Sequence, residues 1–146
     1  MVAMRFGTNT LSGQETESGS TPTPTETLLW TNPNPNSNYS NGEISDSATL
    51  TAYDIIRIYY KLQTSSANTL SSMFHLDISM AEWNLMIEGA SHMRIFLGCT
   101  NGSNQALART LRQTAAGTLF IGNCRQYNST TERAGWCIPY EVYGVK

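Results

Sequence analysis

The side chains that could support acid–base, nucleophilic or metal chemistry are few and scattered in this 146-residue chain. It contains two histidines, three cysteines and eleven acidic residues. His75 and His92 fall on the polar faces of alternating segments, where a solvated histidine is the ordinary outcome. The acidic residues do not recur at a spacing typical of a catalytic carboxylate pair. No phosphate-binding glycine loop, serine-nucleophile motif or zinc-binding histidine pair is present. We therefore expect no enzymatic activity and no bound cofactor.

The cysteines are Cys99, Cys124 and Cys137. Their odd number and wide spacing do not fit a disulfide framework, and a zinc site would need a CxxC pair, which the chain lacks. We expect these thiols to be small buried hydrophobic side chains, and we expect no metal site.

Aromatic residues near amide side chains are the remaining candidates for a binding surface. An aromatic ring stacks on the apolar face of a pyranose, while amides bond to the sugar hydroxyls. Tyr39 and Tyr127 lie in Asn-rich stretches, and Trp83 follows a polar stretch. These three residues are the candidate glycan contacts. The alternative, that outer-face aromatics such as Tyr59 pack against a sister subunit, stays open.

The composition indicates a β-rich protein. Charged residues make up 14% of the chain, against about 25% in typical proteins. Threonine, serine and asparagine, at 18, 15 and 12 residues, replace them, and only two lysines are present. Threonine suits exposed strand faces and Asn and Ser suit turns, whereas the usual surface helix formers are scarce.

The charge and hydropathy patterns exclude several classes of partner. The net charge of −2 gives no basic field for nucleic acid or anionic lipid. No apolar run approaches the roughly 20 residues of a membrane span, and the first residues do not resemble a signal peptide. We expect a protein made in the cytoplasm, without nucleic-acid or membrane partners.

Alternation with a period of two predicts a half-buried strand at residues 54–62. The residues expected on its inner face are Ile56, Ile58, Tyr60 and Leu62. The residues expected on its outer face are Arg57, Tyr59 and Lys61.

Further alternating segments predict strands at residues 72–78, 92–99, 107–113, 118–124 and 136–145. Residues 115–117 form a plausible three-residue hairpin loop between two of them. Pro139, which lacks an N–H donor, favours an edge strand or a strand start for the last segment.

One segment has a helical signature. Ser79 and Glu82 have the spacing of a capping box, Met80 and Trp83 share a helical face with Ile87, and Gly89 can end the helix. Apart from this helix, seven or eight short strands separated by turns predict an all-β, antiparallel β-sandwich of jelly-roll type.

The chain divides into three parts. Residues 1–11 are mildly apolar, and residues 12–27 form a Ser/Thr/Pro-rich linker whose TPTPT sequence favours an extended spacer. Residues 28–146 form the globular body. The N-terminal segment is either a frayed end or a peptide that anchors the body to a larger assembly.

Five stretches of the body resemble sequence motifs of one protein family. They are LWTNPNPNSNY at 29–39, YDIIRIYY at 53–60, ARTLR at 108–112, TLFIG at 118–122 and IPYEVYGVK at 138–146. Together they resemble the C-terminal β domain of fibre-like virion proteins from tailed bacteriophages. That family has an LWTNPNP opening, an RT strand and a terminal IPxxIYGIK. The resemblance covers residues 28–146.

The resemblance implies a non-enzymatic virion protein, commonly a homotrimer, displayed on the particle surface. No repeat or heptad shaft precedes the body, so a head fibre or capsid decoration protein fits better than a long tail fibre. On this interpretation residues 1–11 bind capsid or tail proteins. The anchoring side chains would be Val2, Met4, Phe6 and Leu11. The alternatives are a tail-fibre tip that recognises host surface glycans, and a stand-alone carbohydrate-binding module or enzyme fragment.

Overall fold

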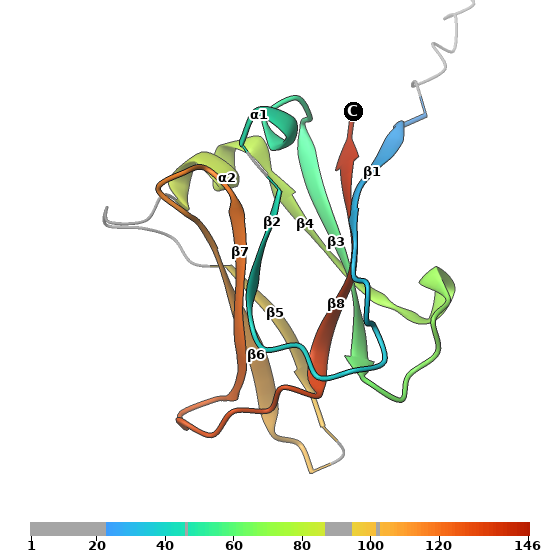
Figure 1. The fold of residues 1–146 in the computed structure, drawn as a ribbon, viewed down its shortest axis with the longest axis vertical. Coiled ribbons are helices and arrows are strands. Elements are labelled where there is room, and N and C mark those ends of the chain that lie inside the picture. Colours follow the sequence, from blue (N-terminus) through green and yellow to red (C-terminus); the bar gives the residue numbers. More distant parts are fainter. Residues whose placement is uncertain (1–22, 46, 87–94, 102) are drawn as a thin grey trace, which may run out of the picture.

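The computed structural model describes residues 23–45, 47–86, 95–101 and 103–146, and within them eight strands form two antiparallel sheets. The sheets pack face to face (Figure 1). The first sheet has the order β1 (Glu26–Thr31), β8 (Trp136–Val145), β3 (Ile55–Gln63), β4 (Phe74–Ser79). The second has the order β2 (Gly42–Ser45), β7 (Leu119–Gln126), β6 (Ala106–Gln113), β5 (Ile95–Thr100). The predicted antiparallel β-sandwich is confirmed.

The first two strands pair with the last two in nested order, as in a jelly roll, whereas β3 with β4 and β5, β6 and β7 in succession pair with their neighbours along the chain. β1 pairs with β8 in one sheet, and β2 pairs with β7 in the other. Thr25 and Lys146 exchange two backbone hydrogen bonds just beyond the first pair. The chain therefore enters the described body beside its C-terminus, at the end opposite the β5–β6 and β7–β8 loops (Figure 1).

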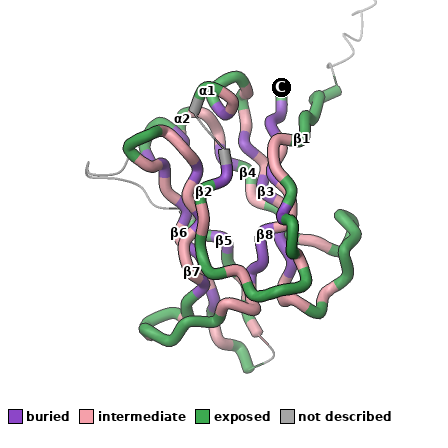
Figure 2. Tube along the Cα trace, viewed as in Figure 1, coloured by how far each residue is buried: buried purple, intermediate pink, exposed green. Residues whose placement is uncertain are grey.

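The inner faces of the two sheets form the hydrophobic core (Figure 2). Ile56 and Ile58 of β3 and Leu111 of β6 are fully buried. Each such side chain stabilises the fold by about 1.5–3 kcal/mol through removal from water. Two short helices, α1 (Ser47–Leu50) and α2 (Met80–Leu85), cover one end of the core, because Leu50 and Trp83 are also fully buried.

The predicted capping box starts α2. The Glu82 backbone N–H donates to Ser79 Oγ at 3.2 Å, and the Ser79 N–H donates to Glu82 Oε2 at 2.8 Å. These bonds satisfy two groups that a helix N-terminus otherwise leaves unpaired. A short 3₁₀ helix, η1 (Leu70–Ser72), precedes β4.

The predicted hairpin at residues 115–117 is confirmed. Thr114 and Thr118 close the loop through a 2.9 Å backbone bond. Gly117 has φ of 80°, a left-handed conformation that glycine adopts without a steric penalty.

The prediction that Lys61 faces solvent is wrong. The alternation of β3 holds as far as Tyr60, but the pairing with β8 shifts between Tyr59 and Tyr60 because Tyr140 is an extra residue on β8. Lys61 is fully buried, because loop residues on either side of it cover its side chain and accept hydrogen bonds from its ammonium group. Leu62, expected inside, is only half-buried.

The prediction of an edge position for the last strand is also wrong, because β8 lies between β1 and β3. Pro139 sits next to the bulge and beyond the last β1 pair, Thr31 with Glu141. A proline is tolerated there because regular ladder pairing is interrupted.

Several predictions fall outside the described residues. They concern the anchoring peptide 1–11 with Val2, Met4, Phe6 and Leu11, most of the linker 12–27, and His92 with its neighbours at 87–94. At the linker boundary, β1 begins at Glu26, two residues before the expected start of the body.

Candidate functional site

The three candidate glycan contacts occupy different settings. Tyr127 is 74% exposed, and Trp83 is completely buried. The expectation that Trp83 contacts a glycan is wrong, because its ring forms the core-facing side of α2. Tyr39 is half-buried and lies under the Arg109 guanidinium at 5.2 Å. Desolvation raises the pKa of the Tyr39 phenol, with Arg109 acting in the opposite direction.

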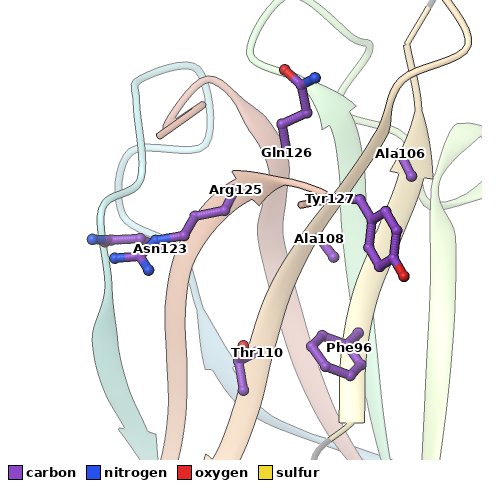
Figure 3. Close-up of a pocket in the computed structure, with 8 residues that line it drawn as sticks. All are labelled: Phe96, Ala106, Ala108, Thr110, Asn123, Arg125, Gln126 and Tyr127. Atoms are coloured by element: carbon purple, nitrogen blue, oxygen red, sulfur yellow. The ribbon is translucent and has the colours of Figure 1, made fainter. Parts of the chain in front are cut away.

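Tyr127 borders an open hollow of about 300 Å³ on the outer face of the β5–β6–β7 sheet (Figure 3). Eight residues line it: Phe96, Ala106, Ala108, Thr110, Asn123, Arg125, Gln126 and Tyr127. We call it the Phe96–Tyr127 hollow.

The alternation of β6 creates the floor of the hollow. Leu107, Arg109 and Leu111 point into the core, which leaves the small side chains of Ala106 and Ala108 on the outer face. Small residues between larger neighbours produce a depression on a sheet surface.

Two aromatic rings stand on one side of this floor. Phe96, 55% exposed, belongs to β5 and pairs with Thr110 of β6. The backbone of Tyr127 is held by a 2.8 Å bond from its N–H to the Ala106 carbonyl. Figure 3 shows the two rings one above the other along the strand direction. Exposed aromatic rings next to a shallow floor are suited to stacking against a flat apolar surface.

A polar network forms the other side of the hollow. Asn123 Nδ2 donates to Glu132 Oε1 at 2.6 Å, and Asn123 Oδ1 accepts from Asn41 at 3.0 Å. Arg125 lies 3.6 Å from the same Glu132 oxygen. The lining of the hollow thus combines aromatic carbon with amide and guanidinium groups, which can bond to sugar hydroxyls, while Glu132 outside the lining contacts Asn123 and Arg125.

The outer face of the β1–β8–β3–β4 sheet has a different character, because its polar groups pair with one another. Arg57 contacts Glu26 and forms a bidentate pair with Asp77, at 2.7 and 2.6 Å. The hydrogen bond from Arg57 is the main cause that lowers the pKa of Asp77. His75 is exposed, as predicted, and its ring lies 5.7 Å from that of Tyr59.

Tyr143 completes this face and does not provide a reactive group. Its ring packs edge-on against Tyr59, and its hydroxyl donates to Glu141 at 2.8 Å. Desolvation first, and then this bond, raise the pKa of Tyr143 to about 12. The phenol stays protonated at neutral pH.

The described residues contain no group of three or more His, Cys, Asp or Glu side chains placed to hold a metal ion. Nor does any helix in this part of the chain have the length and apolar character to span a membrane.

Sequence reasoning found Tyr127 but missed Phe96 and the floor of the hollow. The alternating segment ALARTLRQ places Ala106 and Ala108 on the outer face of β6, and Phe96 lies on the preceding strand. This pattern of small outward residues could have indicated the floor of the hollow. Comparison of the chain with protein-family models, curated proteins and solved structures found no match.

Proposed function

We propose that this chain is a non-enzymatic structural protein of a bacteriophage virion, a head-fibre or capsid-decoration appendage that displays its β-sandwich at the particle surface. In this proposal the protein is a homotrimer, and residues 1–11 attach it to capsid or tail proteins.

The observation that supports the proposal is that the motifs behind the phage resemblance bond to one another. Asn32 of the LWTNPNP stretch donates to the Pro139 carbonyl of the C-terminal stretch at 2.8 Å. Arg109 of the RT pair donates to the carbonyls of Trp136 and Cys137, just before that stretch. The motifs therefore specify one structural framework rather than a catalytic centre.

The same part of the fold accounts for the NPNPN sequence. The three N–H groups of the Lys61 ammonium are shared among four oxygens, at 2.8–3.1 Å, from the loops on either side of it. Those oxygens belong to Pro35, Asn36, Thr64 and Asn68. These bonds offset the cost of burying the amine and connect the loop at Pro35 and Asn36 to β3.

Attachment is tested by producing variants during infection and purifying the particles on a density gradient. A variant with Val2, Met4, Phe6 and Leu11 all changed to Ser is expected to be lost from particles while its body remains folded by circular dichroism. A matched control changes Glu15 and Glu17 to Ser in the spacer and should still load. Loading of the first variant at the wild-type level would refute the anchor.

The trimer has its own test. Light scattering of the purified full chain is expected to give three times the 16.1 kDa chain mass. A monomer at working concentration would refute the oligomeric part of the proposal.

A second candidate function is a receptor-binding tip, or more generally a carbohydrate-binding module, and the Phe96–Tyr127 hollow favours it. A pyranose would stack on Phe96 and Tyr127 and bond to Asn123 and Arg125. The hollow adjoins the β5–β6 and β7–β8 loops, which lie at the end of the body opposite the C-terminus (Figure 1). Thr25, near the end of the linker, pairs with the C-terminal Lys146.

A glycan array with the full chain tests this second function. Selective binding should be lost in Phe96→Ala and Tyr127→Ala and kept in Leu85→Ala, which truncates a 60% exposed side chain on α2. Binding that survives both aromatic substitutions would place the site elsewhere. Hydrolysis of a bacterial polysaccharide by the purified chain would refute the non-enzymatic assignment.

A further inference from the structure

Three cysteines that the proposed function leaves unused converge inside the sandwich. Cys99 comes from β5, Cys124 from β7 and Cys137 from β8, so the first two belong to one sheet and the third to the other. The Sγ atoms of Cys99 and Cys137 lie 3.0 Å apart. Cys137 Sγ also lies 3.7 Å from the Leu107 carbonyl oxygen, and the Cys124 thiol interacts with Cys137 as well.

A buried positive charge lies beside these thiols. Arg109 is fully buried, and its Cα pairs with that of Cys124 across the β6–β7 ladder. Its guanidinium donates to five carbonyl oxygens, including that of Cys137 at 2.7 Å. Within the described residues, these partners and the Tyr39 ring supply no carboxylate to neutralise it.

This environment favours a thiolate at Cys99 and Cys124. The hydrogen bond with Cys137 is the main cause that lowers the pKa of both thiols, and the charge of Arg109 acts in the same direction. The pKa of Cys137 is raised, first by its hydrogen bonding with the Cys124 and Cys99 thiols and then by burial. The thiolate is the form that attacks a disulfide.

Accessibility distinguishes the three residues. Cys124 and Cys137 are completely buried, whereas Cys99 is only half-buried. A small reagent therefore reaches Cys99 first, and the nearest sulfur to Cys99 is that of Cys137.

We propose that Cys99 and Cys137 are a redox-active pair that forms a disulfide between the two sheets on exposure to a small disulfide such as oxidised glutathione. The Cys99 thiolate attacks one sulfur of the oxidant, forms a mixed disulfide and releases one glutathione thiolate. Cys137 then loses its proton to that thiolate and attacks Cys99 Sγ, which releases the second glutathione. The two protein thiols are oxidised, and one glutathione disulfide is reduced to two glutathione thiols.

The bond would join strands β5 and β8 across the core, between residues 38 positions apart. A cross-link of this length restricts the unfolded chain and is expected to raise Tm by roughly 10 °C. In a reducing cytoplasm the thiols stay free, and in an oxidising medium a disulfide cross-links the two sheets. The inference does not depend on the proposed virion role.

The test uses the full chain, incubated with oxidised glutathione, alkylated and digested with trypsin. Cleavage after Arg94, Arg109, Arg125 and Arg133 places the three cysteines on different peptides. The expected product joins peptide 95–109 to peptide 134–146, with the loss of two hydrogens. The matched control Cys124→Ala should give the same product and the same gain in Tm, both reversed by dithiothreitol. Cys99→Ala and Cys137→Ala should give neither.

Peptide mapping of the wild-type chain identifies the disulfide directly, even if a cysteine variant does not fold. A product joining Cys124 to Cys137 or to Cys99, a bond between two copies of the chain, or complete alkylation of all three thiols would each overturn it.

Discussion

The side-chain amide of Asn32 donates a 2.8 Å hydrogen bond to the carbonyl oxygen of Pro139, 107 residues further along the chain. The Asn32 backbone N–H donates to the neighbouring Tyr140 carbonyl at 2.8 Å. Its side-chain oxygen accepts from the Asn34 N–H at 2.9 Å and so forms the turn that follows β1. One buried asparagine therefore fixes both the end of β1 and the bulged part of β8.

Replacement of Asn32 by Ala should destabilise the protein by about 1–3 kcal/mol, because buried hydrogen-bonding groups lose their partner. The measurement is urea unfolding followed by circular dichroism. Asn34→Ala is the matched control in the same loop. Asn34 is exposed and contributes its backbone N–H to the turn, so its truncation should cost less than about 0.5 kcal/mol. Equal losses in the two variants would contradict this account of Asn32.

Replacement of Gly144 by Ala should destabilise the protein by about 1–3 kcal/mol or more, since an overpacked interior forces its neighbours to move. A Cβ at this position would lie 2.3 Å from ring carbons of Tyr53. At Gly98, the control, the nearest atom would be the Leu107 carbonyl oxygen at 3.6 Å, an ordinary contact. Thermal unfolding of the two variants measures the difference.

A double-mutant cycle identifies the cause of the Gly144 effect. In a Tyr53→Ala background the ring is absent, so Gly144→Ala should cost clearly less than in the wild type. An unchanged cost would show that Tyr53 is not the obstacle.

Replacement of Arg109 by Lys should destabilise the fold by about 3–5 kcal/mol, although the charge is conserved. The guanidinium reaches five carbonyls from three separate segments. A lysine ammonium has three donors on one atom and cannot span them. Arg125→Lys, on an exposed part of β7, should change stability by less than about 0.5 kcal/mol. Similar urea midpoints for the two variants would refute the bridging role.

Stability should depend on the Arg57–Asp77 pair in a pH-dependent manner. The pKa of Asp77 is lowered in the folded protein, so its contribution is present above the usual value of 3.8 and is lost as the pH falls through the lower folded value. Asp77→Asn should cost about 0.5–1 kcal/mol at pH 7, because the pair is partly exposed. The gap between variant and wild type should narrow progressively as the pH falls below 3.8, and it should shrink in 1 M salt. A gap that does not change as the pH is lowered from 7 into the acid range would contradict the ion pair.

Short-range chemistry made some elements predictable from the sequence. The Ser79–Glu82 capping box and the hairpin around Gly117 depend on residues within a few positions, and both were found. The alternation at Ile56 and Ile58 also identified the correct buried face. The same helical spacing that pairs Met80 with Trp83 already indicated burial, and the polar residues before Trp83 were the misleading signal.

Long-range pairing explains what the sequence did not reveal. The burial of Lys61 results from acceptors in two loops, one of which precedes β2 and the other of which follows β3. Pro139 is tolerated in a central strand because the pairing of β8 with β1 has already ended at Glu141. The Phe96–Tyr127 hollow requires the register of three strands, and no local pattern around Phe96 specifies which side chains lie opposite.

The enclosure of Lys61 has a practical consequence. The chain has a single other lysine, the exposed Lys146. Acylating reagents need a free amine, so in the native protein they should modify Lys146 and spare Lys61. Acylation of Lys61 would therefore report that the loops around residues 35 and 68 have separated from its ammonium group.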